Sequence, residues 1–227
     1  ISPGANNVLR ANKDFQDTVR AEGIQIYMPT TQEWNRNEQQ QLKEVSIEDL
    51  LPRDEISIDM ESVGSMLHGK RILITGSAGS IGSEMVRQIA KYNPAELILI
   101  DSAETPQHDI RLMMAKQFPE IKAETIVTTI CSKSRMEHIF KTYLPDYVFH
   151  AAAYKHVPMM ENNPCESIQN NVYGTKILAD LAVKYGVKKF VMISTDKAVN
   201  PTNVMGCSKR ICEIYVQSLN KAIEEGI

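Results

Sequence analysis

The chain has 227 residues, of which 43% are hydrophobic and 23% are charged, and its formal net charge is −3. This composition is ordinary for a globular protein and leaves room for one full domain, or for one domain and part of a neighbour. The weakly acidic balance gives no electrostatic argument for binding nucleic acid or an anionic membrane surface.

The cysteines Cys131, Cys165, Cys207 and Cys212 form no Cys-x-x-Cys pair, and no histidine lies at metal-ligand spacing from them. We therefore expect free thiols in a reducing compartment and no metal site. No apolar run reaches the ~20 residues that a bilayer-spanning helix needs, and no signal-peptide pattern is present. The first residue is Ile1 rather than Met, so we expect the chain to be an excised piece of a longer protein.

The sequence before the main domain carries weaker patterns. Ser46 and Asp49 are typical of the capping pair of a short helix. Hydrophobic spacing and turn-forming residues predict four further segments: a helix over residues 7–19, a short strand over 24–28, a polar loop over 30–41 and a short helix over 59–67.

From Lys70 the chain alternates between short apolar runs and amphipathic segments. The apolar runs predict strands over residues 71–75, 96–101, 124–130, 147–153 (with its loop) and 188–194. The amphipathic segments predict helices over residues 80–92, 109–118, 134–143, 164–185 and 207–224. Strands that are apolar throughout and alternate with helices are typical of a parallel sheet covered on both faces. We therefore predict an α/β fold with a Rossmann-like, doubly wound parallel sheet.

A glycine-rich turn joins the first predicted strand to the helix that follows it. Gly76 would make the tight turn, Gly79 would let the backbone approach a pyrophosphate, and Gly82 would allow close helix–sheet packing. The free N–H groups and the positive dipole end of the helix would receive the phosphates. The residues predicted to bind a dinucleotide here are Gly76, Ser77, Gly79, Ser80, Ile81 and Gly82.

The ends of the next strands predict the rest of the cofactor site. Asp101 ends the second strand, 19 residues beyond Gly82, where a carboxylate accepts hydrogen bonds from ribose hydroxyls and repels a 2′-phosphate. We therefore predict NAD rather than NADP, with Ser102 also among the cofactor-binding residues. Small side chains would let the cofactor pass close to the backbone at the end of the fourth strand, at Ala151, Ala152 and Ala153.

Five motifs carry a family resemblance over residues 44–220. They are Ile47-Glu-Asp-Leu-Leu51, Thr75-Gly-Ser-Ala-Gly-Ser-Ile-Gly-Ser-Glu84, His150-Ala-Ala-Ala-Tyr-Lys-His-Val-Pro158, Asn170-Asn-Val-Tyr-Gly-Thr175 and Ser194-Thr-Asp-Lys-Ala-Val-Asn-Pro-Thr-Asn-Val-Met-Gly206. The chain resembles the nucleotide-sugar dehydratases of capsular polysaccharide biosynthesis, which are extended short-chain dehydrogenases/reductases. Within them it is most similar to the long, membrane-anchored UDP-N-acetylglucosamine 4,6-dehydratases.

This resemblance implies a domain organisation. Transmembrane helices and another nucleotide-fold-like domain would precede the chain in a parent anchored at the cytoplasmic face of the inner membrane. Residues 1–42 would be the tail of that region and a linker, and residues 43–69 a lead-in. Residues 70–227 would be the NAD-binding domain, truncated before the C-terminal substrate lobe, so we expect this piece by itself to be soluble and inactive. The helices over 164–185 and 207–224 resemble those that pair subunits, which implies a homodimer or higher homo-oligomer.

The chain departs from the usual pattern at two places. Residues 128–131 read Thr-Thr-Ile-Cys where the family usually has Gly-Asp-Val, whose Asp contacts adenine. A hydroxyl can still form a hydrogen bond, so Thr129 and Ile130 remain predicted cofactor contacts. Most of the wider superfamily has a Tyr at the position of Met205, four residues before an active-site lysine, here Lys209. A phenol transfers a proton and a thioether does not, so either the chemistry is lost or the base lies elsewhere.

The resemblance implies an internal redox cycle. NAD⁺ takes hydride from C4 of the sugar, a base removes the C5 proton, water leaves from C6, and the hydride returns to C6. We assign acid/base duty at the C4 or C6 oxygen to Asp196, and positioning of the sugar to Thr195. Lys197 would remove the C5 proton if burial and the neighbouring Lys209 lower its pKa, although the roles of Asp196 and Lys197 could be exchanged. Lys209 would bind the nicotinamide ribose, and Met205 would pack against substrate or nicotinamide.

The substrate is expected to border the segment that follows the fourth strand. Tyr154, Lys155 and His156 lie there, and Asn171 is predicted to join them. Lys155 would meet a phosphate or a sugar hydroxyl. A lone histidine is more often a structural hydrogen-bond partner than a catalyst, so His156 is not our candidate for the base.

Three other functions stay open. A nucleotide-sugar epimerase shares the fold, NAD and the oxidation at C4, but it usually keeps the Tyr that Met205 replaces. A C5-inverting dehydratase is closer still. A non-catalytic NAD-binding module belongs to a different functional class. A site that has lost its catalytic activity is not expected to keep Asp196, Lys197 and Lys209 together.

Overall fold

The computed structural model describes residues 27–29, 42–44 and 59–226, and the chain divides into two compact units, 1–58 and 59–227. In the first unit, β1 (Tyr27–Pro29) pairs antiparallel with β2 (Leu42–Glu44). The strand predicted over residues 24–28 overlaps β1 at its last two positions. The predictions for residues 7–19, for 30–41 and for the helix capped by Ser46 and Asp49 lie outside the described residues.

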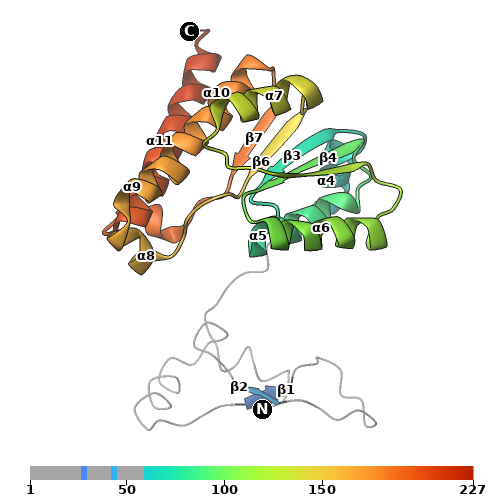
Figure 1. The fold of residues 1–227 in the computed structure, drawn as a ribbon, viewed down its shortest axis with the longest axis horizontal. Coiled ribbons are helices and arrows are strands. Elements are labelled where there is room, and N and C mark those ends of the chain that lie inside the picture. The colour runs from blue at the N-terminus through green and yellow to red at the C-terminus, as the bar shows by residue number, and fades with distance from the viewer. Residues whose placement is uncertain (1–26, 30–41, 45–58, 227) are drawn as a thin grey trace. The chain divides into compact units, whose positions relative to one another are not determined.

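The second unit is built on a five-stranded parallel sheet with the order β5-β4-β3-β6-β7 (Figure 1). The strands are β3 (Arg71–Thr75), β4 (Glu96–Asp101), β5 (Ala123–Val127), β6 (Tyr147–His150) and β7 (Lys189–Met192). Each strand is followed by helix, and all neighbouring strands run parallel. The predicted doubly wound α/β fold is confirmed.

Helices cover both faces of this sheet (Figure 1). On one face lie α4 (Met60–Leu67), α5 (Ser80–Ala90) and α6 (Glu104–Gln117). On the other lie α7 (Lys133–Tyr143) and α10 (Gly174–Lys184), and α11 (Val204–Glu224) packs alongside α10. None of the helices within residues 59–226 is long and apolar enough to cross a membrane.

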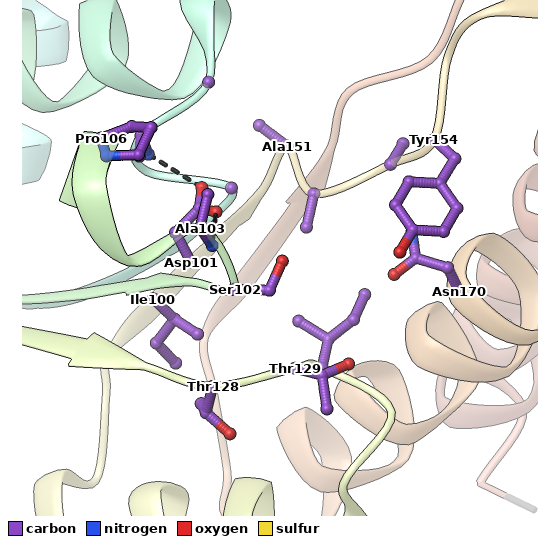
Figure 2. Close-up of a pocket in the computed structure, with 16 residues that line it drawn as sticks. Ile100, Asp101, Ser102, Ala103, Pro106, Thr128, Thr129, Ala151, Tyr154 and Asn170 are labelled. Atoms are coloured by element: carbon purple, nitrogen blue, oxygen red, sulfur yellow. Dashed lines mark hydrogen bonds between the residues drawn. The ribbon is translucent and has the colours of Figure 1, made fainter.

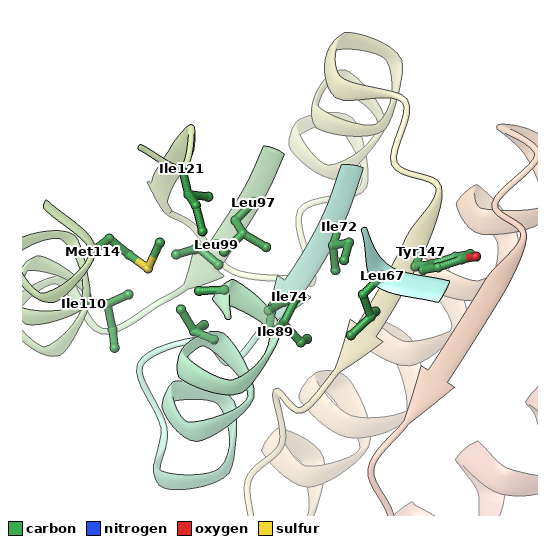
Figure 3. Packing of buried hydrophobic residues seen from close by; sticks show 12 residues of the cluster. Leu67, Ile72, Ile74, Ile89, Leu97, Leu99, Ile110, Met114, Ile121 and Tyr147 are labelled. Carbon is green, nitrogen blue, oxygen red and sulfur yellow. The ribbon is translucent and has the colours of Figure 1, made fainter. Parts of the chain in front are cut away.

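Alternate residues of the central strands enter two separate hydrophobic cores. Ile72 and Ile74 of β3 pack with Ile89 of α5 and with Ile110 and Met114 of α6, as Figure 3 shows. The residue between them, Leu73, enters the opposite core with the residues of α7 and α10. Successive strand side chains point to opposite faces, so a strand covered on both sides is apolar at every position.

The lead-in helix belongs to the second unit. Asp59 caps α4, because its Oδ1 accepts hydrogen bonds from the backbone N–H groups of Glu61 and Ser62, both at 3.1 Å. Leu67, at the other end of α4, is buried in the core beside Ile72. The helix predicted over residues 59–67 is confirmed, and its packing joins it to the sheet.

Several element boundaries differ from the predicted ones. The third strand ends at Val127 rather than at residue 130, and α6 begins at Glu104 rather than at residue 109. Pro106 falls in the first turn of α6, where a missing N–H breaks no helical hydrogen bond. The predictions omitted three short elements: β2, α8 (Val157–Asn162) and the 3₁₀ turn η3 (Asp196–Ala198).

The long helix predicted over residues 164–185 is continuous but not uniform. It begins as α9 (Pro164–Ser167), widens into the π-helical segment η2 (Ile168–Tyr173), and continues as α10. The N–H of Gly174 reaches the carbonyls of both Asn171 and Gln169 at this junction. Short π segments inside α-helices are frequent at functional sites.

Candidate active site

A cavity of about 340 Å³ opens at the carboxyl ends of the strands, where parallel sheets bind their ligands (Figure 2). One wall is the glycine turn after β3, with Gly76, Ala78 and Gly79, and the other walls are the segments that follow β4, β5 and β6. Figure 2 shows Asp101 and Pro106 on one side of the cavity and Tyr154 and Asn170 on the other. The residues predicted for the cofactor that line it are Gly76, Gly79, Asp101, Ser102, Thr129, Ile130, Ala151, Ala152 and Ala153.

The glycine turn is fixed by backbone contacts that exclude a side chain. Gly76 has a φ of 69°, and a Cβ added there would lie 2.6 Å from the backbone N of Ala152. A Cβ added at Gly82 would overlap the carbonyl oxygen of Gly76. Gly79 is the N-cap of α5, whose first turn carries no acidic side chain that would occupy the free N–H groups. The turn therefore presents an open helix N-terminus suited to an anion.

Other residues of this turn do not line the cavity. The Ser77 side chain is fully buried, and its hydroxyl donates to Oε1 of Gln107 on α6 at 2.8 Å. Gln107 in turn donates to the Leu99 carbonyl at 2.7 Å, so Ser77 anchors the turn to α6. Ser80 and Ile81 lie exposed in the first turn of α5. Gln107 was missed in the sequence, although it shares the core-facing spacing of Ile110 and Met114.

Asp101 is held in a fixed orientation at the cavity wall. Its Oδ2 accepts from the N–H of Ala78 at 3.0 Å, and its Oδ1 accepts from the N–H of Ala103 at 2.9 Å. Asp101 is the only charged residue among the described residues that line the cavity. Each oxygen keeps a free lone pair, so the carboxylate can also accept hydrogen bonds from a ligand.

The residues predicted to bind the substrate differ in their position relative to the cavity. Tyr154 lines the cavity, and the Lys155 ammonium lies 3.5 Å from the Ser80 hydroxyl, across the glycine turn. His156 is exposed and occupies the N-cap position of α8. Asn171, by contrast, is buried.

The side-chain amide of Asn171 forms its hydrogen bonds with other residues of the protein. Its Oδ1 accepts from the Tyr154 N–H at 2.8 Å, and its Nδ2 donates to the Tyr154 carbonyl at 3.0 Å. The same Nδ2 donates to the Ser208 hydroxyl on α11 at 2.9 Å. Asn171 therefore ties the Tyr154 backbone to α11, and Ser208 is a supporting residue that the sequence patterns did not reveal.

The Thr195–Lys197 turn packs against the N-terminus of α11. A Cβ at Gly206 would overlap the Lys197 carbonyl oxygen, so only glycine permits this approach. The Thr195 hydroxyl donates to Asp196 Oδ1 at 2.9 Å, and the Lys197 ammonium lies 3.3 Å from the same oxygen. The Thr195 hydroxyl, followed by Lys197, lowers the pKa of the Asp196 carboxyl. Asp196 is therefore ionised in this arrangement.

Lys197 does not meet the burial condition that its role as base requires in this chain. Its side chain is 49% exposed and forms an ion pair with Asp196. The buried lysine is Lys209, which is only 5% exposed, and burial lowers the pKa of its ammonium group. Met205 is also buried, one turn before Lys209 on the same helix. An ordinary surface role for Lys209 is therefore excluded.

A buried polar chain crosses the end of the sheet beneath the cavity. Thr75 Oγ1 lies 2.7 Å from His150 Nδ1, and Thr175 Oγ1 lies 2.8 Å from His150 Nε2. Burial, and secondarily the charge of Lys209, lowers the pKa of His150 to about 3. The neutral imidazole therefore links β3, β6 and α10 by two hydrogen bonds.

Residues 72–226 match the family model described as "Polysaccharide biosynthesis protein". The chain belongs to this family. It is 44% identical over 204 residues to the capsular polysaccharide biosynthesis protein CapD of Staphylococcus aureus, a match that covers 88% of this chain and 34% of that protein. It is 36% identical over 145 residues to a UDP-N-acetylglucosamine 4,6-dehydratase (inverting) of Campylobacter jejuni, covering 63% of this chain and 42% of that protein. The resemblance drawn from the five motifs is confirmed.

Solved structures of related enzymes share the fold of this family member. The UDP-glucose 4-epimerase of Thermotoga maritima, solved with UDP-glucose, superposes with a TM-score of 0.59 at 27% identity, covering 69% of this chain and 52% of that one. The Bordetella bronchiseptica enzyme WbmG, solved in complex with NAD, superposes with a TM-score of 0.56 at 25% identity. The match covers 66% of this chain and 50% of WbmG. The chain thus spans between about a third and about half of the proteins that it matches.

Replacing Gly76 tests the close approach of the two backbones. Gly76→Ala should lower the free energy of unfolding by about 3 kcal/mol or more, because it combines left-handed strain with a clash. Gly186 has a nearly identical φ of 68°, but no atom lies within 4 Å of an added Cβ. Gly186→Ala should therefore cost only about 1 kcal/mol of strain. Urea unfolding of both variants measures the difference, and equal losses would show that the contact with Ala152 is unimportant.

Burial of neutral His150 makes the stability depend on pH. Its pKa is about 3 in the folded chain and 6.5 when unperturbed, so below pH 6.5 the unfolded chain binds a proton that the folded chain does not. The free energy of unfolding should therefore fall by about 1.4 kcal/mol per pH unit between these values on account of this group. His150→Gln should flatten the slope of stability between pH 6 and about 5. Exposed His138→Gln is the control, and equal slopes in the two variants would contradict the assignment.

Proposed function

We propose that this chain is the cofactor-binding part of an NAD-dependent nucleotide-sugar 4,6-dehydratase that acts on UDP-N-acetylglucosamine. The observation that carries the proposal is the arrangement on α11. Met205 replaces the usual proton-transferring Tyr and is buried one turn before buried Lys209, while the Asp196–Lys197 pair packs against the first turn of the same helix. The similarity to the Campylobacter jejuni dehydratase supports the same reaction.

The residues of the cavity fit NAD. The N-terminus of α5 with Gly79 would receive the pyrophosphate, Asp101 would accept hydrogen bonds from the adenosine ribose, and Lys209 would bind the nicotinamide ribose. A carboxylate at the ribose favours NAD over NADP because it repels a 2′-phosphate. When bound, the cofactor supplies a reversible acceptor for hydride. The complex of the related WbmG with NAD supports this choice.

The proton transfers would fall to the Thr195–Lys197 turn. Ionised Asp196 would accept the proton of the C4 hydroxyl as C4 is oxidised, and would later return it to the hydroxyl that leaves from C6. Thr195 would orient the sugar. Desolvation by the bound sugar lowers the pKa of an ammonium group, so Lys197 would lose its proton to solvent once the sugar separates it from Asp196. The neutral amine would then remove the C5 proton and return it to C5 after water has left from C6. Met205 would pack against the sugar or nicotinamide without transferring a proton.

Proton NMR of UDP-N-acetylglucosamine incubated with the protein at its natural full length tests the reaction. A new high-field methyl doublet from C6 is the expected result. Inversion at C4 with no methyl signal would instead identify an epimerase, the activity named for the related Thermotoga maritima enzyme. NAD binding with no change in the sugar would identify a non-catalytic module.

Two substitutions test the proton transfers. Asp196→Asn and Lys197→Ala should each lower turnover by roughly 10²-fold or more, because each removes a group that moves a proton. Lys116→Ala on the exposed surface of α6 is the control, and its rate should be unchanged. Initial rates of methyl formation measure the effect, and a near-normal rate in either site variant would remove that residue from the mechanism.

A further inference from the structure

The end of the cavity formed by the segments that follow β4 and β5 is lined largely by neutral residues. Ser102 and Pro106 follow β4, and Thr128 and Thr129 follow β5. Asp101 is the only charged residue among the described lining residues, and both of its oxygens already accept backbone N–H groups. The hydrogen-bonding side chains that remain near this end are hydroxyls.

The positions of the segments that line the cavity assign its β4–β5 end to the purine base. The open N-terminus of α5 suits the pyrophosphate, and Asp101 suits the ribose attached to it. The base of the same nucleotide must extend beyond the ribose, toward the segments that follow β4 and β5. Ser102 and Thr129 therefore lie where the edge of the base is read (Figure 2).

The Thr129 hydroxyl keeps both kinds of hydrogen-bonding capacity. Its oxygen accepts one hydrogen bond, from the N–H of Cys131 at 3.2 Å, and the side chain is exposed at the cavity rim. A hydroxyl has one donor and two acceptor sites, so Thr129 can still donate once and accept once. A carboxylate at the same place would only accept, and would favour a 6-amino purine over a 6-oxo purine.

We propose that this chain does not discriminate by hydrogen-bond polarity between purine bases, and binds dinucleotides with a 6-oxo purine about as well as those with adenine. The proposal rests on the proposed binding of NAD. Thr129 is the residue that sets this tolerance, because rotation of its hydroxyl presents a donor to an oxo group or an acceptor to an amino group. Such a site recognises the ribose and the shape of the purine ring, and does not distinguish an amino from an oxo group at C6.

Isothermal titration of the protein at its natural full length with NAD and with nicotinamide hypoxanthine dinucleotide tests the proposal. The two dissociation constants should agree within about threefold, because the Thr129 hydroxyl can pair with the group at C6 of either base. A preference for NAD of about tenfold or more would overturn the proposal, since that is the effect of one unsatisfied hydrogen bond. Failure of both dinucleotides to bind would instead overturn the proposed cofactor.

Two substitutions at the same position show whether Thr129 is responsible. Thr129→Asp should raise the preference for NAD by about tenfold, because a carboxylate repels the 6-oxo group. Thr129→Val keeps the side-chain shape without the hydroxyl, and should weaken the binding of both dinucleotides by a similar factor. The ratio of dissociation constants is the readout, so a general loss of affinity does not affect it. An unchanged ratio in Thr129→Asp would show that the residue does not face the base.

Discussion

At the candidate site, backbone segments approach one another more closely than a Cβ atom allows. Gly76 meets the backbone of Ala152, Gly82 meets the carbonyl of Gly76, and Gly206 meets the carbonyl of Lys197. The first contact holds the turn after β3 against the segment after β6, and these two segments form two walls of the cavity. The second contact closes the turn itself onto the first residues of α5. The third holds the Asp196–Lys197 turn against the helix that carries Met205 and Lys209. The positions of the candidate groups thus depend on three glycines.

Buried polar contacts complete this framework. His150 joins two threonines beneath the cavity, and Asn171 joins the Tyr154 backbone to Ser208. Both side chains are buried with their hydrogen-bonding groups satisfied, so each stabilises one arrangement of the elements around it. The candidate proton-transfer groups differ, because Asp196 and Lys197 are exposed and, among the described residues, their side chains pair with each other and with Thr195. The framework beneath the cofactor cavity is therefore buried, whereas the groups that would act on the sugar face outward.

The sequence predicts the sheet well because its signal is local. The apolar runs of β3 and β4 lie between polar residues, and both strands begin and end where predicted. The glycine turn and Asp101 are also read from adjacent residues, and both line the cavity. Gln107, Ser208 and Gly206 were missed, because their contacts join segments far apart in the chain or depend on helix packing. The sequence left the burial of Lys197 as a condition for its role, since exposure depends on what covers a residue and not on its neighbours in sequence.

The π-helical segment η2 constrains the number of residues in the helix that contains it. A π segment holds one more residue than an α-helical turn, which changes the phase between the residues before it and those after it. Here that phase lets Asn171 face Tyr154 and Ser208 while Ile177, Leu178 and Leu181 face the core. Removing one residue from this segment would rotate the two sets by about 100° relative to each other. The number of residues in this helix, as much as their identity, is therefore fixed by the need to serve both the core and the site.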